Sequence, residues 1–303
     1  MESRSKDKII VILGPTSSGK SDAAVKLARK YNGEIVSADS RQIYKGMDIG
    51  TGKISKAEQE LVKHWMIDIA NPKANYNVSK FKKEAEKIIK NILKRGKLPI
   101  ICGGTGFWIK AIVDDVDFPE VKPNAELRRK LDRKNTEELF GILQKLDPER
   151  ASNIDAKNKV RLVRAIEIAK TLGYVPKIDT KYNIQDTKYH FLQIGIKIEK
   201  NKLHQNIKKR LRKRFKQGMI EEVKKLHKSG LSFPKIQSFG LGYFWIPLYL
   251  QNKITKDELF EKVYQAEKDY SKRQMTWFQK DKRIKWIKNY KEIEKEIKSF
   301  IKR

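Results

Sequence analysis

The segment GPTSSGKS, residues 14–21, decides how this chain begins to fold. It follows an apolar run, residues 8–13, and precedes residues 19–31, in which apolar side chains recur at helical spacing. The segment fits the pattern G-x-x-x-x-G-K-[ST], in which backbone N–H groups converge on phosphate oxygens at a helix N-terminus. A strand before the loop and a helix after it are the context that this pattern requires. Residues 14–21, called the phosphate loop below, are therefore predicted to bind a phosphorylated ligand.

Two side chains of the phosphate loop add to its backbone. Lys20 supplies a point charge, and the hydroxyl of Ser21 can ligate Mg²⁺. ATPases and GTPases usually also carry an aspartate at the end of a second apolar strand, which helps to hold the Mg²⁺. Here the third apolar segment runs into LPIICGGTG, residues 98–106, and contains no acid. Because small-molecule kinases can also lack this acid, the ligand is either a nucleotide or a diphosphate without a hydrolysable γ-phosphate. The predicted phosphate contacts are Gly14, Pro15, Thr16, Ser17, Ser18, Gly19, Lys20 and Ser21.

Strand and helix patterns alternate in the first part of the chain. Apolar segments rich in β-branched residues predict buried parallel strands at residues 8–13, 34–37 and 98–102. Helical patterns lie between them, at residues 19–31 and 78–95. This alternation predicts an α/β fold, with a parallel sheet and right-handed crossovers.

Helical patterns alone follow residue 120, and a strand pattern returns only at residues 189–198. We therefore predict a helical insertion, residues 120–188, between two parts of an α/β core, residues 1–119 and 189–303. The second part is predicted to be mainly helical. One of its helices has an apolar stripe, and the opposite face carries Lys208, Lys209, Arg210, Arg212, Lys213 and Lys216. The helices expected in the insertion are residues 125–131, 136–146, 148–154 and 159–172.

The chain of 303 residues carries a formal net charge of +31. Residues 1–119 hold 22 Lys and Arg against 14 Asp and Glu, whereas residues 120–303 hold 46 against 23. A lysine-rich genome would spread this excess more evenly, so its position favours a polyanion such as RNA or DNA as partner. No apolar run has the length of a membrane span, and the first eight residues lack the apolar segment of a signal peptide. We expect a cytoplasmic protein that does not enter a membrane. The single cysteine, Cys102, is expected to be a buried free thiol.

Six further motifs follow the phosphate loop along the chain. They are SADSRQIYKGMDIGTGK (37–53), HWMIDI (64–69), PIICGGTGFWIKAI (99–112), KNKVRLVRAIEIAKTLGYVP (157–176), RFKQGMIEEVKKL (214–226) and SKRQMTWF (271–278). In this order they resemble the motifs of tRNA dimethylallyltransferases, and with the phosphate loop the resemblance spans residues 14–278. This family transfers a dimethylallyl group from its diphosphate to the exocyclic 6-amino group of the adenosine 3′-adjacent to the anticodon, and releases pyrophosphate.

The resemblance implies a P-loop NTPase-like core, Mg²⁺ as cofactor, and the anticodon stem-loop of tRNA and dimethylallyl diphosphate as partners. It also implies that the insertion binds tRNA, and we expect a monomer. The sequence departs from the family pattern at SFGLGYFW, residues 238–245, which lacks the polar residue that commonly follows Gly-Tyr. We therefore assign no site residue to that segment.

The implied reaction needs an acceptor for the amine proton and cations around the departing diphosphate. Asp39 follows the second predicted strand, at the sheet edge where α/β proteins place their sites, and is predicted to be the base. An N-cap or an outer-shell ligand of Mg²⁺ is the alternative reading of Asp39. Thr105 follows a Gly-Gly turn, and its hydroxyl can bond the target base or the diphosphate. Arg214 matches a family arginine that binds diphosphate, and Lys272 and Arg273 are further candidates.

The resemblance also assigns contacts with tRNA. From pattern alone, a solvated face of a helix is the usual explanation of Arg161 and Arg164. The assigned residues are Asp39, Ser40, Arg41, Gln42, Thr105, Arg128, Val160, Arg161, Leu162, Val163 and Arg164.

Three other functions stay open. The phosphate loop alone fits a small-molecule kinase or an RNA-stimulated NTPase. Transfer of the prenyl group to a free adenine nucleotide is a second option, although such a ligand does not need a basic insertion. A non-enzymatic RNA-binding module would explain the charge but would leave the phosphate loop and Asp39 without a role.

Overall fold

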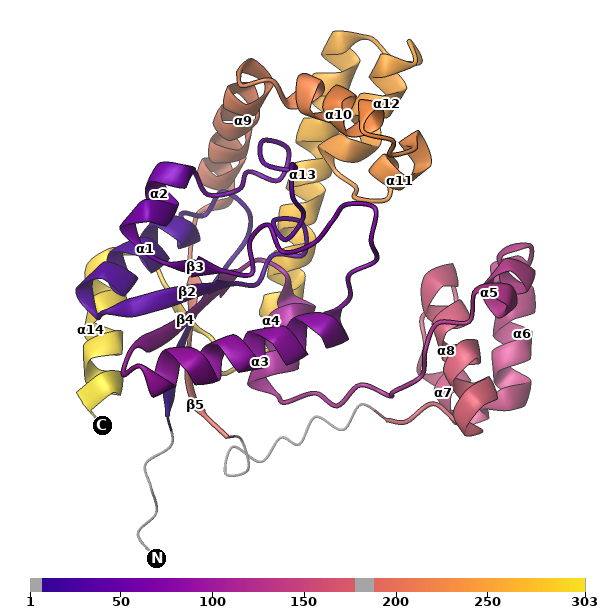
Figure 1. The fold of residues 1–303 in the computed structure, drawn as a ribbon, viewed down its shortest axis with the longest axis horizontal. Coiled ribbons are helices and arrows are strands. Elements are labelled where there is room, and N and C mark those ends of the chain that lie inside the picture. Colours follow the sequence, from indigo (N-terminus) through magenta and orange to yellow (C-terminus); the bar gives the residue numbers. More distant parts are fainter. Residues whose placement is uncertain (1–6, 178–187, 303) are drawn as a thin grey trace, which may run out of the picture. The chain divides into compact units, whose positions relative to one another are not determined.

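The computed structural model describes residues 7–177 and 188–302, which belong to two compact units (Figure 1). One unit comprises Met1–Asp115 and Tyr182–Arg303, and the other is Val116–Lys181. The second unit overlaps the helical insertion expected at residues 120–188, of which residues 178–187 lie outside the described part of the chain. Binding of tRNA by this unit stays a prediction.

A parallel sheet forms the centre of the first unit. Within the described residues it has six strands, in the order β3-β2-β4-β1-β5-β6, and every neighbouring pair is parallel. The predicted α/β fold with a parallel sheet is therefore confirmed. The two edge strands, β3 and β6, were not predicted, because segments of two and three residues are too short to show a periodic pattern. The strands are β1 Lys8–Leu13, β2 Gly33–Ser37, β3 His64–Trp65, β4 Leu98–Gly103, β5 His190–Ile196 and β6 Lys285–Ile287.

Apolar side chains cover both faces of this sheet. On one face, α1 and α14 contribute residues such as Leu27 and Ile297, which are fully buried. On the other face, α3 and α4 contribute Phe81 and Trp108, whose rings stack with centroids 4.2 Å apart. The helices that follow β5 share this second core through residues such as Leu211. The helices of the unit are α1 Lys20–Lys30, α2 Lys56–Leu61, α3 Val78–Lys94, α4 Gly106–Val113, α9 Lys200–Lys216, α10 Met219–Lys228, α11 Phe233–Gln237, α12 Gly242–Leu250, α13 Lys256–Phe278 and α14 Tyr290–Lys302.

The second unit consists of helices in its described residues, and it has a core of its own. Leu139, Leu143, Leu162 and Ile166 are fully buried in it. Each helix is preceded by Asn or Asp, whose side chain accepts a hydrogen bond from a backbone N–H of the first turn. These caps explain why the predicted boundaries agree with the observed ones to within two residues. The helices are α5 Ala125–Asp132, α6 Thr136–Leu146, α7 Pro148–Ser152 and α8 Lys159–Leu172.

Glu34, in β2, is a buried carboxylate whose charge is fully paired. It accepts two hydrogen bonds from the Arg95 guanidinium, at 2.6 and 2.7 Å, and one each from Lys97 Nζ and Trp65 Nε1, at 2.9 and 2.8 Å. The bonds from Arg95, helped by Lys97 and Trp65, lower the pKa of Glu34 to about 2 against the opposing effect of burial. Because the pKa is lower in the folded state, this carboxylate stabilises the fold above its ordinary pKa of about 4.5, and that contribution is lost as the pH falls towards 2.

Replacing Glu34 by Gln is therefore expected to lower the free energy of unfolding by about 3 kcal/mol at pH 7, because it leaves Arg95 facing a neutral group. Urea unfolding at several pH values measures the effect, and the difference from the wild type should shrink between pH 4.5 and pH 2. Glu294→Gln, which removes an ion pair with the half-exposed Lys30, is the control and should change stability much less. A destabilisation by Glu34→Gln that does not depend on pH would refute the electrostatic explanation.

Candidate active site

The phosphate loop has the conformation that its sequence predicts. It joins the buried strand β1 to α1, and the N-cap of that helix is Gly19, with φ at 89°. Ser17 also has a positive φ, 61°, and the side-chain oxygens of Ser17 and Ser18 are buried without a hydrogen-bond partner in the described part of the chain. Buried hydroxyls without partners are costly unless a ligand completes them. The loop is therefore shaped to receive an oxygen-rich anion.

Lys20 lies at the start of α1 with its ammonium turned back on the loop. Its Nζ donates to the carbonyl of Pro15 at 3.1 Å. Burial lowers the pKa of Lys20, and the guanidinium of Arg210 lowers it further. A phosphate bound in the loop would relieve this unfavourable burial of a cation, because it supplies the missing negative charge. Cys102 is the buried free thiol that the sequence predicts, and burial raises its pKa to about 11.

Gln274 of α13 fastens the phosphate loop to the end of β4. Its Oε1 accepts from the backbone N–H of Thr16 at 2.8 Å, and its Nε2 donates to the carbonyl of Gly104 at 2.8 Å. A side chain at Gly104 would collide with that amide, which explains the glycine. The sequence motif SKRQMTWF contains Gln274, but its contacts could not be predicted, since they join residues 258 and 170 positions apart.

Arg210 of α9 brings a second cation to the phosphate loop. Its Nη1 donates to Thr16 Oγ1 at 3.2 Å, and its Nη2 donates to the carbonyl of Gly52 at 2.7 Å. Burial lowers the pKa of Arg210, and Arg214 acts in the same direction. The sequence indicates an exposed basic face for Arg210, and this interpretation is wrong. The side chain is half-buried between two loops of the core.

Arg214, the arginine predicted to bind diphosphate, has other partners in the structure. It is buried, donates from Nη1 to the carbonyl of Gly50 at 2.9 Å, and forms an ion pair with the buried Glu267. Arg210 lies one helical turn before it, on the same side of α9. Of these two arginines, Arg210 is the one that contacts the phosphate loop. The spacing of four residues between Arg210 and Arg214 is the sequence signal that could have identified Arg210 as a further candidate ligand of the phosphate.

Asp39 follows β2 at the carboxyl edge of the sheet, as predicted. Its Oδ1 accepts from the backbone N–H groups of Arg41 and Gln42, at 2.9 and 3.4 Å, and so closes a tight turn. Asp39 is close enough to raise the pKa of both Lys20 and Arg210, although burial outweighs this effect in each. A carboxylate therefore lies near the cations of the phosphate loop.

Thr105, Ser40 and Tyr270 meet next to Asp39. The hydroxyl of Thr105 accepts from the backbone N–H of Ser40 at 3.0 Å. The phenol of Tyr270, from α13, lies close to Thr105 and Asp39, and burial together with the charge of Asp39 raises the pKa of Tyr270 to about 12. The sequence predicted Asp39, Ser40 and Thr105 but not Tyr270, which reaches this point because α13 packs against α4 and α9.

Arg41 and Gln42 bind carbonyl groups of the protein itself. Arg41 Nε donates to the carbonyl of Phe239 at 2.7 Å, and Gln42 Nε2 donates to that of Gly52 at 3.4 Å. The segment around Gly52 is fixed in turn by Glu222, which accepts from three backbone N–H groups and from the Tyr243 hydroxyl, at 2.7 to 2.9 Å. These N–H groups belong to Asp48, Ile49 and Gly50. The loops around Asp39 and the phosphate loop therefore form one hydrogen-bonded structure.

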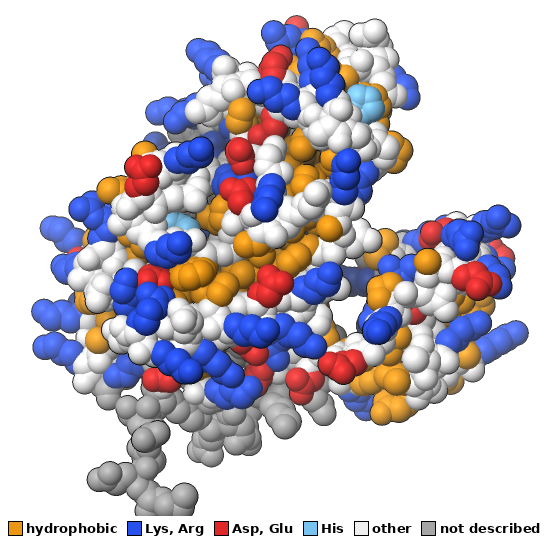
Figure 2. All heavy atoms as spheres, in the orientation of Figure 1, with side chains coloured by type: hydrophobic (Ala, Val, Ile, Leu, Met, Phe, Trp, Pro, Cys, Tyr) orange, Lys and Arg blue, Asp and Glu red, His pale blue; other side chains and the backbone are white. Residues whose placement is uncertain are grey.

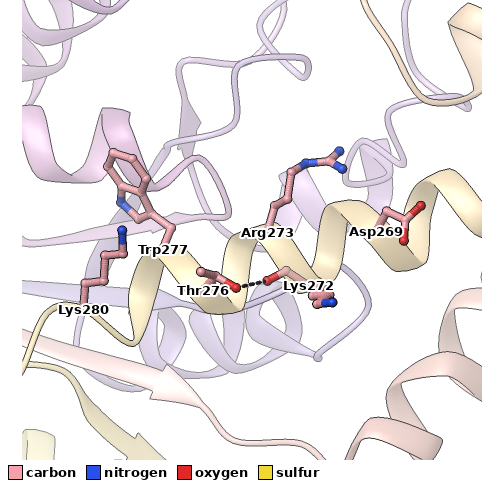
Figure 3. Close-up of a pocket in the computed structure, with 6 residues that line it drawn as sticks. All are labelled: Asp269, Lys272, Arg273, Thr276, Trp277 and Lys280. Atoms are coloured by element: carbon pink, nitrogen blue, oxygen red, sulfur yellow. Dashed lines mark hydrogen bonds between the residues drawn. The ribbon is translucent and has the colours of Figure 1, made fainter. Parts of the chain in front are cut away.

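A surface pocket of about 420 Å³ lies along α13 (Figure 3). Figure 3 shows Trp277 and Lys280 at one end of the row of side chains and Asp269 at the other, with Lys272, Arg273 and Thr276 between them. Trp277 is 41% exposed and packs edge-on against Phe107, with ring centroids 6.2 Å apart. Lys272 and Arg273 are exposed on this surface, whereas their neighbour Gln274 is buried against the phosphate loop. The surface therefore combines cations with an exposed aromatic ring.

The residues predicted to contact tRNA in the second unit fall into two groups. Val160, Arg161, Arg164 and Arg128 are at least partly exposed, Val160 most of all at 78%. Leu162 and Val163 are buried in the core of this unit, so their side chains cannot contact RNA while the unit is folded. In Figure 2, Lys and Arg side chains are scattered over the visible face of each unit.

Two kinds of feature are absent from the described residues. These residues contain no group of three or more His, Cys, Asp or Glu that could hold a metal ion. Among their helices, none combines the length and the apolar character that crossing a membrane requires.

A parallel α/β sheet that carries a phosphate loop, with a carboxylate and a hydroxyl at the same sheet edge, defines a P-loop protein built to act on a phosphorylated substrate. The family model described as IPP transferase matches residues 42–281. The chain belongs to the IPP transferase family, and the resemblance seen in its motifs is confirmed.

Similar proteins cover nearly the whole chain. A tRNA dimethylallyltransferase of Acetivibrio thermocellus is 39% identical over 289 residues, which are 93% of this chain and 91% of that protein. The crystal structure of a full-length tRNA isopentenylpyrophosphate transferase from Bacillus halodurans matches with a TM-score of 0.72 and 32% identity, and covers 98% of this chain and 96% of its own. A eukaryotic dimethylallyltransferase acting on tRNA matches with a TM-score of 0.76 and 26% identity, over 89% of this chain and 69% of its own.

Proposed function

We propose that this protein transfers the dimethylallyl group of dimethylallyl diphosphate to the exocyclic 6-amino group of the adenosine 3′-adjacent to the anticodon of tRNA. The observation that carries the proposal is the position of Asp39 beside the phosphate loop, which carries Lys20, is contacted by Arg210 and has two buried hydroxyls without a partner in the described residues. A prenyl diphosphate needs an anion site for its leaving group, and an adenine amine needs a proton acceptor next to it. Membership of the IPP transferase family supports the same reaction.

The reaction forms one bond and breaks another. The 6-amino nitrogen attacks the allylic carbon, the bond between that carbon and the bridging oxygen breaks, and the electron pair leaves with pyrophosphate. Asp39 accepts the proton of the amine, and Thr105 bonds the target base. Lys20, Arg210 and the amides of the phosphate loop stabilise the charge that grows on the departing diphosphate. Arg214 acts indirectly, because it binds the carbonyl of Gly50, two residues before the Gly52 carbonyl that Arg210 binds.

Mg²⁺ fits the donors of this site. The Ser21 hydroxyl is exposed at the N-terminus of α1 and is the kind of hard oxygen ligand that Mg²⁺ prefers. Mg²⁺ commonly binds through one or two protein oxygens, substrate phosphates and water, so it does not require a carboxylate cluster here. When bound by Ser21 and the diphosphate, it would neutralise part of the leaving group's charge.

The RNA is proposed to contact three regions by its backbone and loop. They are the turn at Asp39 to Gln42, the basic surface of α13 with Lys272 and Arg273, and the exposed residues of the second unit. Exposed cations beside an aromatic ring, as at Trp277, suit phosphates and unstacked bases. We further propose that the protein acts in the cytoplasm as a monomer.

The proposed function is tested with purified protein, dimethylallyl diphosphate, Mg²⁺ and a synthetic anticodon stem-loop. Mass spectrometry of the digested RNA is expected to show one prenyl group on the target adenosine, with one pyrophosphate released per transfer. An otherwise identical RNA with guanosine at that position is the control and should release none. Release of pyrophosphate without RNA would refute tRNA as acceptor.

A kinase or NTPase remains the alternative that the phosphate loop alone allows. It predicts RNA-stimulated release of γ-phosphate from ATP, which a phosphate assay on the same samples detects. We expect none above background.

A further inference from the structure

Glu167 of α8 is a charged side chain in the interior of the second unit, with 1% of its surface exposed. Its carboxylate binds two arginines that come from different helices. Arg128 of α5 donates from Nε and Nη2, at 3.0 and 2.8 Å, and Arg164 of α8 donates from Nη1 at 2.5 Å. The backbone N–H of Asn124 completes the set at 2.6 Å. One buried carboxylate thus fixes two guanidinium groups.

Both arginines keep part of their surface free. Their side chains are 39% and 35% exposed for Arg128 and Arg164. The contacts with Glu167 leave Nη1 of Arg128 for another acceptor, while Arg164 spends Nη2 on the carbonyl of Val121 at 2.9 Å and keeps Nε. Each guanidinium is therefore oriented by the protein on one side and open to solvent on the other.

The charge of Glu167 is maintained although it is buried. Burial of the carboxyl favours its neutral form, but the hydrogen bonds from Arg128, Asn124 and Arg164 outweigh it and lower the pKa of Glu167. In return Glu167 raises the pKa of Arg128. A buried ion network of this kind is weak evidence for stability, because apolar residues of similar volume often serve as well. Stability of the core alone therefore does not explain why Glu167 and its two arginines form this network.

We propose that Glu167 is a positioning residue that pre-orients Arg128 and Arg164 to bind backbone phosphates of the RNA substrate. This inference rests on the proposed function, since it takes RNA as the ligand of this unit. A guanidinium presents donors in a fixed fork that matches phosphate oxygens, and an arginine that is already held loses less conformational freedom when it binds. Arg161, exposed one turn before Arg164, extends the same cationic strip.

Charge and orientation make opposite predictions for Glu167→Gln. The substitution removes a negative charge, so a surface that works only by net charge would bind RNA more tightly and with a steeper dependence on salt. A surface that depends on orientation would bind RNA less tightly, because an amide has one acceptor oxygen and no charge, whereas the carboxylate has two acceptor oxygens that bind both arginines. We expect the second result, with a rise of about tenfold in the KM for anticodon stem-loop RNA.

The experiment compares steady-state kinetics of the full-length wild type and Glu167→Gln, with RNA and dimethylallyl diphosphate varied separately. The KM for dimethylallyl diphosphate and the kcat at saturating RNA should not change. Glu137→Gln removes an exposed carboxylate from the same unit and should leave the KM for RNA unchanged or slightly lower it. Unchanged or tighter RNA binding by Glu167→Gln would refute the proposal.

Arg128→Lys gives an independent test, because it keeps the positive charge beside Glu167 and removes the fork. We expect the KM for RNA to rise several-fold at an unchanged kcat, and the change to be smaller when Glu167→Gln is already present, since the two residues act together. Arg129→Lys, at the exposed neighbouring position, is the matched control. Full RNA affinity in Arg128→Lys would show that orientation has no part in binding. Failure of the proposed function is distinguishable, since the wild type itself would then prenylate no RNA.

Discussion

Asp39→Asn is expected to lower kcat for prenyl transfer by about 10²- to 10⁴-fold, the usual contribution of a general base. The amide cannot accept the proton of the attacking amine. Its carbonyl oxygen can still accept from the backbone N–H groups of Arg41 and Gln42, so the turn that Asp39 closes should persist. Single-turnover transfer to the anticodon stem-loop measures the chemical step, and RNA binding measured separately should stay within a few-fold of the wild type.

Asp48→Asn is the matched control for this experiment. Asp48 lies in the same connection after β2, and its side chain is 60% exposed and paired with Lys53. Its substitution should leave transfer nearly unchanged. Undiminished turnover in Asp39→Asn would exclude Asp39 as the base, and a loss confined to RNA affinity would instead assign it to recognition of the nucleotide.

The sequence predicted those parts of the fold whose signal is local. β1, β2, β4 and β5 are buried along most of their length, and each contains a short apolar stretch that the sequence shows directly. The sequence predicted the helices of the second unit with nearly correct ends, because the capping residues and the apolar face of each helix lie close together in the sequence. The edge strand β3 contains only His64 and Trp65 and is defined by its pairing with β2, which no local pattern reports.

The difference between local signals and contacts with distant residues also explains which site residues could be predicted. The phosphate loop and Asp39 lie at strand ends, where the order of elements determines their place. Arg210, Gln274 and Tyr270 belong to helices that pack beside the sheet, and Arg210 meets Thr16 across 194 positions of sequence. Which face of a basic helix turns inward depends on that packing. Assigning every residue of a continuous segment to RNA contact also ignores which side chains face the core. Leu162 and Val163 belong to such a segment and are buried.

Arg210→Met is expected to lower kcat/KM for dimethylallyl diphosphate by about 10²- to 10³-fold, the usual effect of removing one donor to a developing negative charge. Methionine preserves much of the length of the side chain but supplies no cation to Thr16 and the leaving group. The melting temperature should change little, because burial and the neighbouring charge of Arg214 already disfavour the charged guanidinium of Arg210 in the folded protein. Transfer kinetics with varied diphosphate and a melting curve on the same sample measure both effects.

Arg214→Met distinguishes the roles of the two arginines of α9, because it is expected to lower stability more, and activity less, than Arg210→Met does. Removing Arg214 leaves Glu267, which is 2% exposed, as an unpaired buried charge, and this should lower the free energy of unfolding by about 3–5 kcal/mol. Activity at a temperature where the variant is folded should fall less than in Arg210→Met. Arg212→Met, on the exposed side of the same helix, controls for the loss of one charge. If Arg214→Met instead remained stable and lost affinity for the diphosphate, Arg214 would be the diphosphate ligand, and the contact of Arg210 with Thr16 would serve only to hold the loop.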